Sequence, residues 1–406
     1  MKQWFLFILL VLLHTFVCGQ DFSNKGTDFW VGYGSHVAMY SSGNGANTQN
    51  MVLYFTSDEV CNIKVDIPGI GWTRNYTVRP NTVTESDIIP KSGAADARLK
   101  DEGVSNKGIH ITSDKAVVAY SHIYDGAVSG ATLLFPTNTL GQDYYTLAFT
   151  QTSNGPDSYS FAFVVATEDN TVVEITPSAN TVTKSAGVTF TQTLQKGQVY
   201  TLLGQPTGGS SNNFTGVDLT GTRIRSISSG TSGCKRIAVY CGSGKINIRC
   251  SISNNDEGSS DNLIQQCFPA NAWGKKYITI PTKDMPNNFF RVMVKDQSTV
   301  VKVNGSVLRG LVNGRYYEFK TNVAGVIEAD NPVMVAQYIT TTTQCDNTGI
   351  GENGDPEMIY LSPVEQTISK ITLNSTTCAN IDKNHHYINI VTKTAAVNAF
   401  KFDGNN

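Results

Sequence analysis

Two short acidic loops are the clearest candidates for metal chemistry in this sequence. The stretch DNTGIGENGDPE, residues 346–357, places Asp346, Glu352 and Asp355 among glycines, and NNDEGSSDN, residues 254–262, has a similar composition. Carboxylate-rich loops with tight glycine turns supply the oxygen ligands that Ca²⁺ prefers. Neither loop has the ligand order of an EF-hand, so the alternative is a solvated turn that uses Asn, Asp and Gly for left-handed backbone. No cofactor other than calcium is indicated.

Cysteines offer disulfide chemistry. The chain has eight, and removal of a leader that contains Cys18 would leave seven, so one must stay free or pair outside the chain. In an exported chain, disulfides are the default use of cysteine. We therefore predict one or two bridges within a local cluster, with the connectivity left open. The spacing is not C-x-x-C and no histidine is interleaved, which argues against zinc. The cluster consists of Cys234, Cys241, Cys250 and Cys267.

The sequence shows none of the common catalytic motifs. The chain contains no G-x-S-x-G elbow, no H-E-x-x-H helix and no phosphate-binding loop. Ser35 and His36 are neighbours, and neighbours on a strand point to opposite faces of a sheet. The same alternation separates His385 from His386. We predict that the protein is not an enzyme.

Aromatic side chains are the best candidates for ligand binding. Trp30 and Tyr33 lie near the start of the chain, and Trp72 lies in the glycine-rich stretch GIGWTRNYT. Exposed aromatic rings stack on sugars or anchor a protein partner. The alternative is packing in the core, because an alternating strand directs half of its aromatics inward. Trp72, in its glycine-rich turn, is the best candidate for an exposed ring.

The elements that must position these residues are repeated. A polar turn, an apolar run and a tyrosine occur in DKAVVAYSHIYD from 114, CKRIAVYCGSGK from 234 and DNPVMVAQYITT from 330. Each is followed by a segment that ends in a proline: Pro136, Pro269 and Pro363. Alternating runs around polar turns predict hairpins between these copies. The pattern predicts an all-β fold of tandem antiparallel β-sandwich-like units. The alternative is a β-propeller built from double-blade repeats.

The repeats divide the chain into expected domains. These are a signal peptide at 1–19, β units at 20–140, 141–273 and 274–366, and the start of an incomplete fourth β unit at 367–406. Its first hairpin would begin at Tyr387, whereas earlier units extend on the order of eighty residues beyond that point, and a truncated sandwich exposes an apolar edge. Further C-terminal domains are therefore expected in the full-length protein.

The N-terminus and the charge indicate location and exclude some partners. Lys2 precedes the apolar run WFLFILLVLLHTFV, with cleavage expected before Gln20. Lipidation of Cys18 is the alternative. This apolar run is too short to be a comfortable membrane span, and no other stretch reaches about 18 apolar residues. A net charge of -2 provides no field that attracts nucleic acid. We expect a secreted or cell-surface protein.

Two stretches carry a family resemblance. DLTGTRIRSISSGTSGCKRIAVYCGSGKINIRC, from 218, and SSDNLIQQCFPANAWGKKY, from 259, resemble the N-terminal region of the IgG Fc-binding protein family. The shared features are a D-L-T-G-T strand, an A-V-x-x-G strand, a cysteine pair, an L-x-x-Q segment and a W-G strand. FSNKGTDFWVGYGSHV, from 22, resembles secreted Bacteroidetes proteins. That resemblance implies adhesion-like repeats and sorting of the type IX or gliding-associated kind.

Together these observations predict a non-enzymatic binding or adhesion module that presents loops from a repeated β scaffold. The expected partners are a glycoprotein, a mucin, a matrix protein or a glycan. One alternative is the carbohydrate-binding part of a glycan-active enzyme, which would require a cleft with two close carboxylates. Immunoglobulin Fc binding, implied by the resemblance, is another.

Overall fold

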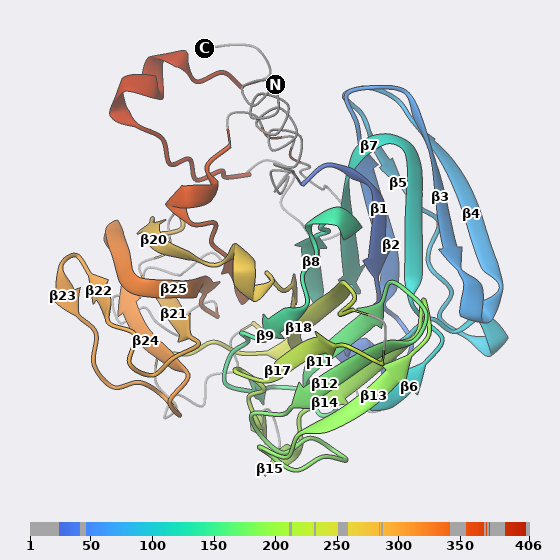
Figure 1. Ribbon diagram of the computed structural model, residues 1–406, viewed down its shortest axis with the longest axis horizontal. Helices are drawn as coiled ribbons and strands as arrows, with labels where there is room; N and C mark the ends of the chain where they lie inside the picture. The colour runs from blue at the N-terminus through green and yellow to red at the C-terminus, as the bar shows by residue number, and fades with distance from the viewer. Residues whose placement is uncertain are drawn as a thin grey trace, which may run out of the picture.

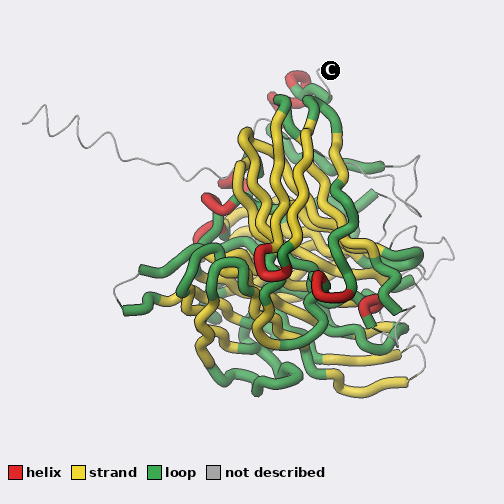
Figure 2. The backbone as a smooth tube through the Cα atoms, turned by 90° about the vertical axis from the view of Figure 1, so that its right-hand side faces the viewer, coloured by secondary structure: helices red, strands yellow, loops and turns green. Residues whose placement is uncertain are grey.

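The computed structural model describes residues 24–40, 46–210, 213–230, 233–250, 259–283, 285, 287–341, 355–368, 371, 373 and 386–402. Antiparallel β-strands dominate this part of the chain, and its helices are short 3-10 turns (Figures 1 and 2). None of these helices is long and apolar enough to cross a membrane.

The first unit is a sandwich of two layers joined by one long strand. The first half of this strand, β7, pairs with β1 and β3, and its second half pairs with β2 and β8. We call the layer of β1, β3 and β4 the outer layer and the layer of β2, β5 and β8 the inner layer. The strands are β1 (Gly26–Val31), β2 (Asn50–Thr56), β3 (Cys61–Ile67), β4 (Trp72–Val78), β5 (Val83–Glu85), β7 (Ile109–Tyr124) and β8 (Ser129–Leu133).

The second unit repeats this pairing, but its long strand is divided in two. β17 pairs with β9 and β12 in the outer layer, and β18 pairs with β11 and β19 in the inner layer. The strands are β9 (Asp143–Tyr145), β11 (Ser160–Ala166), β12 (Thr171–Thr176), β13 (Phe190–Leu194), β14 (Val199–Leu203), β17 (Arg223–Ile227), β18 (Ile237–Ile246) and β19 (Asp261–Gln266). Additions to the repeat are β6 (Gly103–Ser105), which pairs with β14, and a small sheet of β10 (Thr152–Ser153), β15 (Pro206–Ser210) and β16 (Asn213–Gly216).

The third unit has the same order again, with an undivided long strand. β25 pairs with β20 and β22 in the outer layer and with β21 and β26 in the inner layer. The predicted all-β fold of tandem sandwich-like units is therefore confirmed. The strands are β20 (Gly274–Thr279), β21 (Asn288–Val294), β22 (Val301–Val303), β23 (Ser306–Val307), β24 (Tyr316–Thr321), β25 (Gly325–Ile339) and β26 (Glu357–Tyr360).

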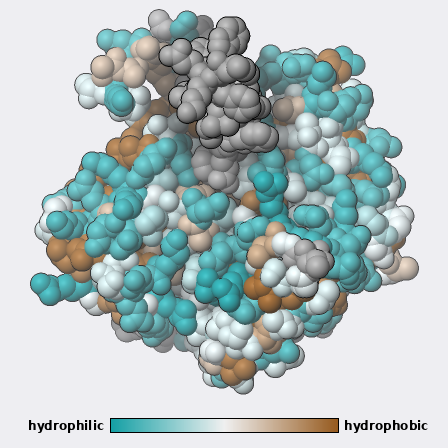
Figure 3. Space-filling model, viewed as in Figure 1, coloured by the Kyte–Doolittle hydropathy of each residue, from teal (hydrophilic) through white to brown (hydrophobic). Residues whose placement is uncertain are grey.

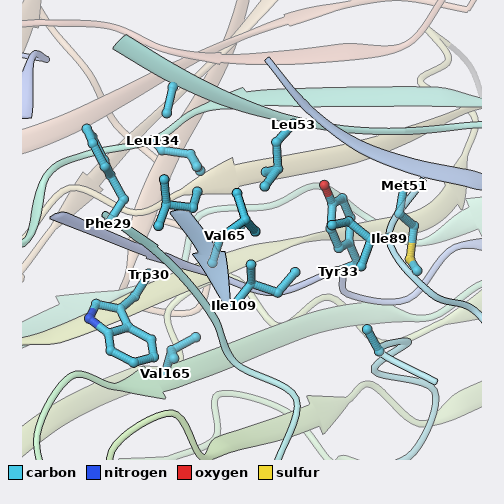
Figure 4. Close-up of a cluster of buried hydrophobic side chains, with 14 of the residues drawn as sticks. Phe29, Trp30, Tyr33, Met51, Leu53, Val65, Ile89, Ile109, Leu134 and Val165 are labelled. Atoms are coloured by element: carbon cyan, nitrogen blue, oxygen red, sulfur yellow. The ribbon is translucent and has the colours of Figure 1, made fainter. Parts of the chain in front are cut away.

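The inner layers join successive units because both of their faces are buried. On β11, Phe161 and Phe163 belong to the core shared with the first unit, whereas Ala162 and Val164 belong to the core of the second. A strand buried on both faces is apolar along nearly its whole length, as SFAFVVA is after its first residue. Figure 4 shows part of the first core, with Val165 of β11 below Trp30. The units are therefore continuous through their cores.

A glycine and a proline mark the ends of every unit. A Cβ atom on Gly26 would overlap Pro136, one on Gly141 would overlap Pro269, and one on Gly274 would overlap Pro363. Each proline precedes a 3-10 turn with nearly the same backbone angles: η4 (Thr137–Thr139), η5 (Ala270–Ala272) and η6 (Val364–Gln366). The first strand of each unit therefore packs directly against the turn that ends the same repeat.

The repeated tyrosines connect one unit to the preceding one. Tyr240 of the second unit donates a hydrogen bond to the Trp30 carbonyl at 2.7 Å, and Tyr338 of the third donates to the Ala148 carbonyl at 2.7 Å. Both side chains are fully buried. Tyr120, the first copy, is half-buried. The motif that marks the repeat in the sequence is thus a junction element in the fold.

The predicted hairpin from Tyr387 is not formed. Residues 386–402 contain the 3-10 helix η7 (Thr394–Ala399), and apolar side chains such as Tyr387, Ile390 and Phe400 are exposed. An isolated hairpin is marginally stable in water, and within the described residues this segment has no neighbouring strand with which to pair.

Candidate binding surface

A hollow of about 440 Å³ lies on the outer layer of the first unit. We call it the β3–β4 groove. The strands that form it are β3, β4 and β7, which stand at the blue edge of the molecule in Figure 1. Its lining residues are Asn62, Ile63, Lys64, Asn75, Tyr76, Thr77, Thr112, Ser113 and Asp114.

Strand alternation makes the wall of the groove polar. In CNIKVDI the apolar residues alternate with Asn62, Lys64 and Asp66, so one face packs inward while the other faces solvent. The register then places Lys64 opposite Asn75 on β4 and opposite Thr112 on β7. Amide, hydroxyl and ammonium groups are therefore aligned across three strands. Figure 3 shows that the molecular face seen in that view is also largely hydrophilic.

Hydrogen bonds fix one end of the groove and leave the middle open. Asn62 donates to Asp114 through its backbone nitrogen at 2.8 Å and its side-chain amide at 3.0 Å, which lowers the pKa of Asp114. The Lys64 ammonium is 3.6 Å from Asp66, and its side chain is 51% exposed. Within the described residues, no side-chain hydrogen bond engages Asn75 or Thr112. These three side chains can therefore meet a ligand without breaking a strong internal contact.

The corresponding surfaces of the other units pair their own charges. In the second unit, Arg223 makes two hydrogen bonds to Asp143, each of 2.9 Å, and Arg225 contacts Glu174 at 2.6 Å. In the third unit, Lys276 contacts Glu328 at 2.9 Å. The first unit differs at the position on its long strand, where it has the uncharged Thr112 and the other two units have Arg225 and Glu328.

The aromatic residues predicted to bind a ligand are in the core instead. Trp72 is 9% exposed, Trp30 2% and Tyr33 0%, so the expectation that Trp72 is exposed was wrong. Trp72 pairs with Ile67 and faces the inner side of its layer. Trp30 stacks on His110, with ring centroids 4.0 Å apart, and Tyr33 donates to the Val52 carbonyl at 2.6 Å. Alternation, and not the flanking glycines, decides the orientation of Trp72.

The cysteine cluster separates into three environments. Cys234 is exposed and free, whereas Cys241 and Cys267 are buried and free, with their sulfur atoms 3.6 Å apart. Cys250 is disulfide-bonded. The other described cysteines are all free, so the partner of Cys250 lies outside the described residues.

Of the three calcium candidates, only Asp355 belongs to the residues that the structure describes. Asp346 and Glu352 lie outside the described residues, and Asp355 is exposed. Across the ranges that the structure describes, no three His, Cys, Asp or Glu side chains are grouped so that they could hold a metal ion.

The fold nevertheless brings the described ends of these two acidic stretches together, with Asp261 at the start of β19 near Glu357 at the start of β26. Burial raises the pKa of Asp261 well above its usual range, hydrogen bonds from Ser129 and Asn262 oppose this, and the charges of Asp355 and Glu357 raise it further. Burial raises the pKa of Glu357 to about 8. The sequence contains both carboxyl groups, but they are far apart along the chain and only strand packing places them near each other.

These carboxyl groups predict a pH dependence of stability. The folded state keeps a proton on Glu357 that the unfolded chain has released, so the free energy of unfolding should fall as the pH rises from about 7 towards 8. We expect a loss of at most roughly 1 kcal/mol per pH unit, and we expect Glu357→Gln to reduce it. Denaturant unfolding at several pH values measures the slope.

Two buried histidines also contribute to that slope, and an exposed glutamate provides a control. Burial lowers the pKa of His36 and His122 to about 4, so both are neutral in the folded state across this window. In the unfolded chain they still bind protons near pH 6.5, which raises the free energy of unfolding with pH, opposite to the effect of Glu357. This contribution is the same in Glu357→Gln, so the difference between the two slopes reports Glu357 alone. Glu85→Gln, on exposed β5, should leave the slope unchanged. A Glu357→Gln variant with the wild-type slope would contradict the assignment.

The buried histidines are held by hydrogen bonds through both ring nitrogens. In His36, Nδ1 accepts from Ala38 N at 3.2 Å and Nε2 contacts the Val128 carbonyl at 3.3 Å. In His122, the two nitrogens contact Tyr54 at 3.1 Å and Ser129 at 2.9 Å. Rings held in this way orient loops and strands, and general-base catalysis would require breaking one of these contacts.

Comparison with known proteins adds family information. A family model described as IgGFc binding protein matches residues 130–406, which include the second and third units. No curated protein matches the chain. One solved structure, a GH78 family rhamnosidase of Bacillus sp. GL1, has 9% identity and a TM-score of 0.12 over 80% of this chain and 54% of its own. The chain thus spans about half of that enzyme, and a likeness at this level carries no argument about function.

Proposed function

The chain belongs to the IgGFc binding protein family, and from that premise we propose that it is an exported, non-enzymatic binding module whose β3–β4 groove holds a glycan chain. The groove lies before the matched residues, so the ligand proposed for it rests on its own chemistry. The observation that carries the proposal is the row of available polar groups on Lys64, Asn75 and Thr112.

The composition of the groove favours a sugar over a protein hot spot. Protein interfaces obtain most of their affinity from buried aromatic and arginine anchors. The open part of the groove instead offers an amide, a hydroxyl and an ammonium group. Sugar hydroxyls both donate and accept hydrogen bonds, so they complement this mixture, and the volume is within the usual range for small-ligand sites. Lys64 further favours a glycan that carries a carboxylate or sulfate.

The leader at 1–19 supports export to the cell surface or the medium, where such glycans occur on glycoproteins, mucins and matrix. Residues 1–19 are outside the described part of the chain. Attachment by type IX or gliding-associated sorting remains part of this proposal.

A glycan array with the purified protein tests the groove directly. Lys64→Ala and Asn75→Ala should each weaken binding to the best glycan by about tenfold or more, because hydrogen bonds to charged or buried partners contribute roughly 1.5–3 kcal/mol. Lys302→Ala is the matched control, since Lys302 on β22 occupies the place of Lys64 on β3 in the repeat. Equal binding by all variants would rule out the groove.

Fc binding is the second candidate, because it is the activity that the family description prints. An Fc fragment placed on the same array distinguishes the two. Fc binding that survives both groove substitutions would favour a protein-binding surface elsewhere, within the second and third units.

A further inference from the structure

Cys241 and Cys267 are side by side although they come from different strands. Cys241 lies on β18, and Cys267 follows the end of β19, where its backbone nitrogen donates to the Val239 carbonyl at 2.8 Å. Because Val239 and Cys241 leave the same face of β18, Cys267 lies diagonally across from Cys241 on that face. The two sulfur atoms are 3.6 Å apart, and both side chains are fully buried.

The pair lies at the junction of the second and third units. Tyr360, on β26 of the third unit, places its hydroxyl 3.1 Å from the Cys241 sulfur. The same hydroxyl donates to the Leu147 carbonyl of the second unit at 2.6 Å. The thiols are therefore part of the contact by which the third unit is held against the second.

We propose that Cys241 and Cys267 are a modification site, a dithiol that is oxidised to an intramolecular disulfide in the exported protein. The bond would link β18 to the end of β19 beneath the third unit. This inference rests on the export proposed above and is independent of the ligand of the β3–β4 groove.

The chemistry requires a disulfide oxidant and proceeds by exchange. The Cys241 thiolate attacks a small disulfide and releases one thiol, and Cys267 then loses its proton and displaces the second thiol from the mixed disulfide. Two protein thiols and one disulfide thus become one protein disulfide and two small thiols. Because both sulfurs are buried, exchange occurs during folding or through local opening.

The surroundings of the two thiols shift their pKa values in opposite directions, and the thiol with the lowered pKa is the one that attacks first. Burial by itself would raise the pKa of Cys241, but its hydrogen-bonding contacts with Cys267 and Tyr360 lower it overall. Burial raises the pKa of Cys267 well above its usual range, and its hydrogen bond to Cys241 raises it further. Cys241 is accordingly the attacking thiol and Cys267 the thiol that completes the bond.

The other described cysteines are not competing partners. Cys61 is buried on β3 in the core of the first unit, Cys234 is exposed, and Cys250 is already disulfide-bonded. The thiol contact between Cys241 and Cys267 is thus specific to this pair within the described chain.

Refolding the full chain with oxidised and reduced glutathione tests the proposal. Peptide mapping without reduction should identify a peptide that joins Cys241 to Cys267. The oxidised protein should melt roughly 5 °C higher than the dithiothreitol-reduced protein, because the bond restricts the unfolded chain. Cys267→Ser retains the disulfide of Cys250 but cannot form the new bond. The melting shift between its oxidised and reduced forms, subtracted from the wild-type shift, therefore gives the effect of the new bond.

The outcomes that overturn the proposal are equally direct. One such result is that both cysteines of the oxidised protein react with an alkylating reagent after denaturation, which would show that they are still free thiols. The other is a peptide that joins Cys241 to Cys234. Either result from the wild-type protein would suffice, even if Cys267→Ser failed to fold. Cys61→Ser should leave the cross-linked peptide unchanged. Glycan binding that persists without the disulfide would leave the proposed function intact.

Discussion

Arg291→Ala should be the most destabilising single substitution at the junction of the second and third units, with an expected loss of about 3–5 kcal/mol in the free energy of unfolding. Arg291 is 1% exposed and contacts Asp218 at 2.6 Å and Glu318 at 2.7 Å. Removing the guanidinium group leaves the largely buried Asp218 carboxylate without its partner, whereas the more exposed Glu318 can turn to solvent.

The same side chain contacts the backbone of the second unit and one aromatic ring from each of the two units. Arg291 donates to the Ala148 carbonyl at 2.9 Å, and its guanidinium carbon lies 4.3 Å from the centre of the Phe149 ring and 4.4 Å from that of Tyr316. A lysine has one point charge and lacks the planar fork, so Arg291→Lys should recover little of the loss.

Denaturant unfolding measures this effect, and an exposed ion pair provides the control. Arg74 is 51% exposed and lies 3.3 Å from Asp87. Arg74→Ala should cost less than about 1 kcal/mol, as exposed pairs usually do. Similar losses for the two variants would show that Arg291 does not hold the units together.

Gly141→Ala should have the second-largest effect, with a loss of about 2–3 kcal/mol or failure to fold, because a rigid proline ring occupies the place of the new methyl group. A Cβ on Gly141 would overlap Pro269, whose ring cannot rotate away as a flexible side chain could. The first strand of the second unit would have to move away from its closing turn. Thermal unfolding followed by circular dichroism measures the change.

Gly126→Ala is the matched control, because a Cβ at that position would meet nothing within 4 Å. It should be neutral or slightly stabilising, since alanine restricts the unfolded chain more than glycine does. If Gly141→Ala were as stable as Gly126→Ala, the glycine–proline contact would not define the unit end.

Local patterns were sufficient to predict the strands of the three units and their repetition, although not the state of the segment from Tyr387. The alternation in CNIKVDI and the uninterrupted apolar run in SFAFVVA reflect the burial of one face and of two faces. The repeated tyrosine was identified from its spacing, but its hydroxyl contact with the preceding unit was not. One further signal was present in FFRVMV, where a lone arginine interrupts a strand buried on both faces and thereby indicates a buried ionic partner.

The sequence by itself therefore determined the secondary structure, the repeat and the all-β class, since these depend on periodicities of a few residues. Only the tertiary structure decided which polar and reactive groups meet. It buried Trp72 in the core of the first unit, brought Asp261 near Glu357, and placed Cys267 beside Cys241. It also joined Arg291 to a carbonyl 143 residues away. The physical reason is that alternation sets the face on which a side chain lies, whereas its neighbours are set by pairing and packing between distant strands.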